Sequence, residues 1–170
     1  MNFLRRLFTP APDPREELRP LWQALVAEAR APDWYRECGA ADTLEGRFDM
    51  VSAVLAMALI RMEREPGLAA RTGLLTEIFV EEMDGQLRQT GVGDLMVGKQ
   101  IGKLMATLGG RVGAFRAALA VGDSELEQAV HRNITLADDT RAASLVKGLR
   151  GLARRLDDTG GEGLLRGELA

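Results

Sequence analysis

Apolar residues recur at intervals of three and four positions along most of the chain, and this spacing restricts the fold more than any other feature. The clearest stretch lies between residues 44 and 62, where the repeat is carried by Leu44, Phe48, Val51, Leu55, Leu59 and Met62. This spacing places apolar side chains on one face of an α-helix. No segment shows the alternation typical of a strand. We therefore predict an all-α fold, a single globular bundle of about six or seven helices.

Capping residues and prolines mark the expected helix ends. Asp13 and Pro14 begin a first helix that runs to about Arg30, and Asp42 with Glu45 forms a capping box for the second. Further helices are expected at about 74–89 and 94–121. Ser124 and Glu127 begin a short helix that carries His131, and Asp138 and Asp139 begin a last one that carries Leu145 to Leu156. We expect a helical domain over residues 14–157, preceded by a flexible tail (1–13). The glycine-rich stretch after Asp157 predicts a disordered tail (158–170).

The N-terminal tail combines apolar and basic residues. Phe3, Leu4, Leu7 and Phe8 share a helical face beside Arg5 and Arg6. Such a segment is either a simple tail or an amphipathic contact with an anionic membrane surface.

The composition excludes several classes of function. The 170 residues carry a net charge of -3, which gives no general affinity for DNA. A single cysteine, Cys38, cannot form an internal disulfide, and a single histidine, His131, cannot supply a histidine-rich metal site. Carboxylates cluster at Glu77, Glu81, Glu82 and Asp84, but a di-iron bundle needs further histidines. We predict no metal, no cofactor and no enzymatic activity, because no nucleophile, base and orienting acid come together.

The stretch from Gly93 to Gln100 is one residue short of a phosphate-binding P-loop. Gln100 stands where a P-loop has serine or threonine, and the preceding segment is a helix rather than a strand. A nucleotide hydrolase using Lys99 is therefore not favoured. On a helical wheel the small residues of this region form one stripe, made of Gly98, Gly102, Ala106, Gly109, Gly113 and Ala117. The stripe either packs against a neighbouring helix or accepts a partner's helix.

Two further patterns concern charge. Residues 95–116 and 141–155 carry basic residues without an acid, which indicates either solvated helix faces or a positive surface for phospholipid, RNA or an acidic protein. On the helical wheel Glu82 falls among the apolar residues of its helix and Arg47 at the flank of an apolar stripe, and we hypothesise that they form a buried or half-buried pair.

Three segments together resemble the ubiquinol–cytochrome c chaperone family over about residues 34–134. They are "DTLEGRFDM" (42–50), "FVEEMDGQLRQTGVGDLMVGKQIGKLM" (79–105), and "RVGAF" with "RNI" (132–134). The residues that match the family's motifs are Asp42, Arg47, Asp49, Glu82, Asp84, Arg88, Gly91, Gly93 and Asp94.

The resemblance implies a non-enzymatic chaperone that binds nascent or apo-cytochrome b during assembly of respiratory complex III. Contacts with the ribosome exit region and the inner membrane are implied as well. Without a transit-like leader, we expect a bacterial cytoplasmic protein, peripheral to the inner membrane. The candidate partner-binding residues are Gly98, Lys99, Gly102, Lys103 and Gly113. The alternative is a helical carrier of haem or lipid, with His131 as an axial haem ligand.

Overall fold

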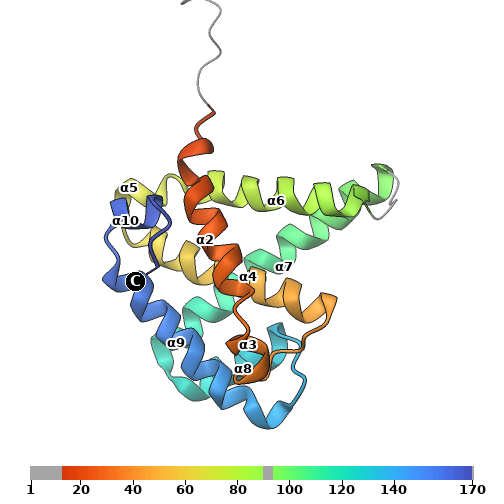
Figure 1. Ribbon diagram of the computed structural model, residues 1–170, viewed down its shortest axis with the longest axis vertical. Coiled ribbons are helices and arrows are strands. Elements are labelled where there is room, and N and C mark those ends of the chain that lie inside the picture. The colour runs from red at the N-terminus through yellow and green to blue at the C-terminus, as the bar shows by residue number, and fades with distance from the viewer. Residues whose placement is uncertain (1–12, 90–93, 170) are drawn as a thin grey trace, which may run out of the picture.

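The described residues, 13–89 and 94–169 of the computed structural model, are helical apart from connecting turns and one isolated bridge between Ala40 and Leu136. The prediction of an all-α bundle is confirmed (Figure 1). The long helices are α2 (Arg19–Ala29), α4 (Leu44–Glu63), α6 (Thr72–Gln89), α7 (Asp94–Val121), α8 (Asp123–Asn133) and α9 (Ala142–Asp158). The short ones are η1 (Glu16–Leu18), α3 (Asp33–Arg36), α5 (Pro66–Ala69), η2 (Asp139–Arg141) and α10 (Gly161–Leu165).

Helix α4 is the centre of the bundle. Every residue from Ser52 to Ile60 is buried, so the helix is covered on all sides rather than along one stripe. It contacts α2, α6, α7 and α9, which surround it in Figure 1. The helix is rich in alanine and methionine, and small and adaptable side chains allow several helices to approach one axis closely.

An aromatic cluster joins α4 to its neighbours α2 and α6. The ring of Phe79 lies 6.0 Å from that of Trp22 in an edge-on arrangement, and 6.3 Å from that of Phe48. Phe79, Leu75 and Ile78 are fully buried, as the apolar spacing of their helix predicts. Packing of this kind stabilises the junction beyond the burial of area alone.

A short extended segment crosses the beginning of α4. Ala41 donates a backbone hydrogen bond to Thr135 (2.9 Å), and Ala137 donates one to Gly39 (3.0 Å). A Cβ atom at Gly46 would overlap the carbonyl of Ala41, so only glycine lets this segment lie against the helix. The N-cap of α4 is Thr43, whose hydroxyl accepts from Gly46 at 3.1 Å. The predicted cap, Asp42, is wrong by one residue.

A buried ion pair connects α4 to α7. Arg111 donates from Nη2 to Oδ1 of Asp49, and only 7% of the arginine side chain and 13% of the aspartate side chain are exposed. The other carboxylate oxygen accepts from the backbone N–H (2.9 Å) and the hydroxyl (2.7 Å) of Thr135. The guanidinium also lies 5.9 Å from the ring centre of Phe48. Asp49 therefore joins α4, α7 and the segment after α8.

The hypothesis of a buried Arg47–Glu82 pair is wrong. Arg47 donates from Nε to Asp42 at 2.6 Å, and both side chains are more than half exposed. Glu82 is exposed on α6. A helical wheel places a residue at the flank of a stripe, but it cannot identify which neighbouring helix covers that flank.

The predicted disordered C-terminal tail is also wrong. Residues 161–165 form α10, and Leu164 and Leu165 are buried against the bundle, where α10 contacts α2. Arg61 of α4 holds the preceding turn by donating to the carbonyls of Leu156 (3.0 Å) and Thr159 (3.1 Å). Two adjacent leucines are too short a signal for periodicity to detect.

The buried pair yields a stability prediction. Arg111→Ala leaves the Asp49 carboxylate buried without its cation, so we expect it to lower the free energy of unfolding by about 3–5 kcal/mol. Arg47→Ala removes an exposed, solvent-screened pair and should lower the free energy of unfolding far less. Urea denaturation of both variants measures the difference. Equal losses would contradict the assignment of Arg111 as the structural arginine.

Candidate functional site

Helix α7 has two faces of opposite character. One face enters the core through Leu108, Val112, Phe115 and Ala118, all of them buried. The other, which we call the small-residue face, consists of exposed residues only: Gly98, Gly102, Ala106, Gly109, Gly113 and Ala117. The helix continues without a break through Gly109 and Gly110.

The glycines of α7 do not serve packing within the described chain. A Cβ atom added at Gly98, Gly102 or Gly113 would meet nothing within 4 Å, and the same holds at Gly109 and Gly110. The alternative that the stripe packs against a neighbouring helix of the same domain is therefore wrong. The stripe leaves the backbone of α7 accessible from outside.

An open groove of about 940 Å³ runs between α6 and α7, beside the small-residue face. In Figure 1 these helices form two arms that diverge from the connection between them. The floor is apolar and consists of Leu59, Val80, Ile101 and Met105. Met105, which the sequence assigned to the inner face of its helix, is 38% exposed, because α6 leaves α7 uncovered at this point. Gly98 belongs to both the groove and the small-residue face.

The charged residues that line this α6–α7 groove are mainly acidic. Glu77, Glu81 and Asp84 of α6 and Glu63 of α4 line the groove, together with Arg15 and Arg88. On α7, Lys99 and Lys103 are exposed, and neither makes an ion pair with the described residues. The groove therefore combines an apolar floor with a mainly acidic rim, and the two lysines lie outside its lining, on the exposed surface of α7.

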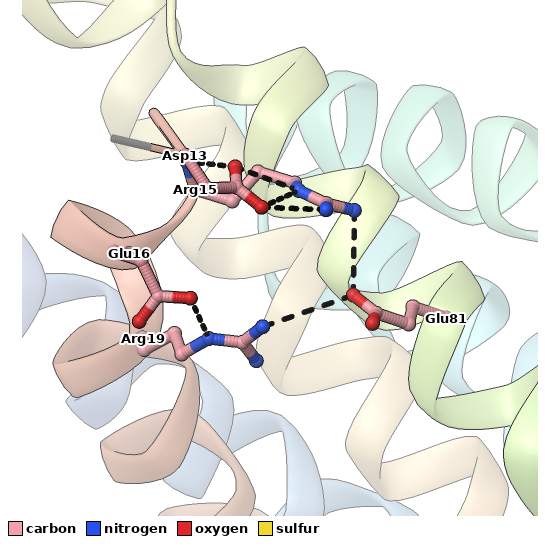
Figure 2. Close-up of polar contacts among 5 residues, drawn as sticks. All are labelled: Asp13, Arg15, Glu16, Arg19 and Glu81. Carbon is pink, nitrogen blue, oxygen red and sulfur yellow. Dashed lines mark hydrogen bonds and ion pairs between the residues drawn. The ribbon is translucent and has the colours of Figure 1, made fainter. Parts of the chain in front are cut away.

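The segment before α2 is fixed to the acidic rim, as Figure 2 shows. Arg15 and Arg19 both approach one carboxylate oxygen of Glu81, at 3.3 Å and 3.9 Å. Arg15 also donates to Asp13 (2.6 Å), and Arg19 donates to Glu16 (2.7 Å). Hydrogen bonds from the guanidinium and the backbone N–H of Arg15 lower the pKa of Asp13 from 3.8 to about 2. The described chain thus begins at the edge of the groove.

The described residues of the family signature separate into two groups, apart from Glu82, which is exposed on α6 and does not line the groove. Asp42, Arg47 and Asp49 act in the fold, at the start of α4 and in the buried pair. Asp84 and Arg88 line the groove and form an ion pair at 2.7 Å. Gly91 and Gly93 lie outside the described residues, as does the side chain of Asp94. Sequence reasoning missed Arg15, Leu59 and Val80 as groove residues, since they come from three separate helical segments.

The other chemical hypotheses gain no support from the geometry. Lys99 lies inside α7, and the element before it is the helix α6, so the strand and loop of a P-loop are not formed there. The side chain of His131 is 42% exposed on α8, and it does not line the α6–α7 groove.

Most bases of the two basic segments have acidic partners from elsewhere in the chain. Arg111 pairs with Asp49, Arg116 with Glu63 at 2.6 Å, and Arg155 with Glu28 at 2.7 Å. Arg141 and Arg150 also pair, with Asp138 and Asp123. The sequence showed no acid within these two segments, but in the described structure acids from other parts of the chain neutralise most of their bases.

By length and composition, the residues Gly98–Val121 of α7 are long and apolar enough to cross a membrane, with a mean hydropathy of 1.3. Only 28% of this apolar window is buried. The buried arginine at its centre, Arg111, joins the helix to the bundle. Among the described residues of this helix, the exposed large apolar side chains are Met105 (38%) and Val121 (70%).

Comparison with known proteins agrees with the resemblance found in the sequence. The family model for the ubiquinol-cytochrome C chaperone matches residues 36–170, which extends beyond the 34–134 of the quoted motifs. Among solved structures, the Cbp3 homolog from Brucella abortus matches with a TM-score of 0.78 and 32% sequence identity. The match covers 90% of this chain and 87% of that one. No curated protein matches the chain.

A glycine substitution separates an outward-facing stripe from a packed one. Gly102→Ala should raise the free energy of unfolding by about 0.5–1 kcal/mol, because alanine favours the helix and its Cβ meets no neighbour. Gly148→Ala is the control, since its Cβ would lie 2.7 Å from Trp34 and should destabilise. Chemical denaturation measures both. A loss at Gly102 as large as that at Gly148 would mean that the stripe is covered.

The contact between Asp13 and Arg15 predicts an acid titration. Asp13 should titrate with a midpoint near pH 2 in the folded protein, and Arg15→Gln should return its pKa toward 3.8. Because the folded pKa lies below the unfolded one, ionised Asp13 stabilises this turn above pH 3.8, and the effect disappears as the pH falls through about 2. Carboxyl ¹³C NMR follows the titration, with the distant Arg166→Gln as control. An unchanged midpoint in Arg15→Gln would refute the assignment.

Proposed function

The chain belongs to the ubiquinol-cytochrome C chaperone family, and we propose that it binds newly made cytochrome b at the α6–α7 groove and the adjacent small-residue face. Membership of the family supports a role in assembling ubiquinol–cytochrome c reductase, carried out by binding rather than by catalysis. The observation that carries the choice of site is the uncovered face of α7, where a row of glycines faces open space.

The spacing of these small residues suits a transmembrane client. Gly98, Gly102 and Ala106 follow one another at four-residue steps, and so do Gly109, Gly113 and Ala117. Small residues at this interval allow two helix backbones to approach closely, which is how many transmembrane helices associate. In this arrangement α7 covers the surface of a cytochrome b helix that later packs against other helices of cytochrome b.

The groove beside this face supplies the rest of the contact. Its floor of Leu59, Val80, Ile101 and Met105 removes apolar side chains of the client from water. Met105 is adaptable in shape, which favours several client sequences over one. The exposed Lys99 and Lys103 at the edge suit acidic connecting loops of a client, or anionic lipid beside which it is inserted.

The proposed role places the protein at the cytoplasmic side of the inner membrane, near ribosomes that synthesise cytochrome b. Binding and release at an open groove need no cofactor. The groove residues Arg15, Glu81 and Arg88 are already engaged in ion pairs, which favours a binding surface over a catalytic one.

Site-specific crosslinking tests the client and the site together. A photo-crosslinking amino acid at Lys99 should form an adduct with cytochrome b in cells that are synthesising it. Lys147 is the matched control, because it is an exposed lysine on α9. We expect no adduct from position 147. An adduct from 147 with none from 99 would show that the client binds elsewhere.

A second variant tests the floor of the groove. Met105→Glu introduces a charge among apolar side chains, and the cost of desolvating it should weaken the cytochrome b adduct from position 99 by at least about tenfold. Met105 is 38% exposed, so the fold should be retained, which circular dichroism can verify. An undiminished adduct in a folded Met105→Glu variant would remove the groove from the site.

A further inference from the structure

The α6–α7 groove fits a second occupant within the same chain. We propose that residues 1–12 bind in this groove when no client is present, with their apolar residues on its floor and their two arginines on its acidic rim. The proposed function supplies the client that would compete for the groove, but occupancy by the chain's own segment does not depend on the identity of that client.

Charge complementarity is the first argument. The groove is lined by four carboxylates and two arginines, which gives a formal charge of −2. Residues 1–12 contain Arg5 and Arg6 and no acid, which gives a formal charge of +2. Glu77 is the carboxylate of this rim for which no ion pair is found among the described residues, and it is exposed. An incoming arginine can therefore pair with it without breaking an existing contact.

Apolar complementarity is the second argument. Phe3, Leu4, Leu7 and Phe8 surround the two arginines in the sequence. The floor of the groove presents Val80, Ile101 and the exposed Met105. A segment with apolar and basic residues in one short run matches a groove with an apolar floor and an acidic wall.

Position is the third argument. Asp13 is held at the rim by Arg15, which itself lines the groove and contacts Glu81 (Figure 2). Leu7 lies six positions before Asp13, a distance of up to about 20 Å when the chain is extended. Helix α6, with 18 residues, is about 27 Å long. An extended segment attached at Asp13 is therefore long enough to span most of the groove, and its effective concentration there is on the order of 1 mM.

Disulfide trapping in the purified full chain tests this proposal. In a Cys38→Ala background, Leu7→Cys is combined with Met105→Cys in the groove, or with Val121→Cys as control. Both partners are exposed apolar residues of α7, at 38% and 70% exposure. Under mild oxidation at low protein concentration, we expect the 7–105 disulfide to form at least about tenfold faster than the 7–121 disulfide. Equal rates would overturn the proposal.

Charge variants of the same pair provide a second measurement. Arg5→Glu with Arg6→Glu should reduce the rate of 7–105 trapping to that of the control, and Arg5→Lys with Arg6→Lys should preserve it. A disulfide-linked dimer as the main product would assign the groove to the segment of a second copy and contradict binding within one chain. A third outcome is that no 7–105 disulfide forms in solution, while the protein binds phosphatidylglycerol vesicles and needs Arg5 and Arg6 to do so. This outcome would assign the segment to the membrane instead.

Because no client is present in these experiments, their failure leaves the cytochrome b proposal intact. Conversely, the 7–105 disulfide could form fast while no client adduct forms from position 99. This result would support the intramolecular contact and contradict the client site. The two proposals can therefore fail separately.

Discussion

The buried contact between Asp49 and Arg111 determines which face of α7 meets the core. Removing two charges from water costs several kcal/mol for each ion, and only good geometry with further hydrogen bonds offsets this cost. Thr135 supplies those hydrogen bonds to the Asp49 carboxylate, whereas Nε of Arg111 is buried without a hydrogen-bond partner, so the contact forms at one rotation of α7. A shift by one residue turns a helix by about 100° and would withdraw Arg111 from Asp49. The same constraint holds the small-residue face outward.

The sequence predicted the helices well because apolar residues recur along them at helical spacing, and this spacing is visible without knowledge of the helices that pack against it. The stripe of α9, formed by Leu145, Leu149, Leu152 and Leu156, is fully buried as expected. Contacts between helices were not predictable in this way. Arg47 was assigned a buried partner and is exposed, whereas Arg111 was counted among surface bases and is buried. The groove was missed for the same reason, since Arg15, Leu59 and Val80 meet only in the folded chain.

The glycines of α7 lower the stability of the helix, and their presence needs an explanation. Five glycines inside a helix cost on the order of 4–5 kcal/mol relative to alanine. Nothing in the described chain packs against them, so no internal contact offsets this cost. Residues that reduce stability without a structural benefit are expected where a protein binds its partner. The exposed backbone of α7 is thus better explained by what approaches it than by what it supports.

A groove filled by its own chain must still open for a client, and the strength of that contact sets the balance. With an effective concentration on the order of 1 mM, a segment whose intrinsic dissociation constant is also about 1 mM occupies the groove half of the time. The apparent affinity for a client then falls by only about twofold. A segment that binds this weakly covers the apolar floor after one client has left and before the next one binds. It does not prevent the binding of a partner that buries the whole of α7. Two arginines and four apolar side chains, joined to the rim through Asp13 and Arg15, suit a contact in this range.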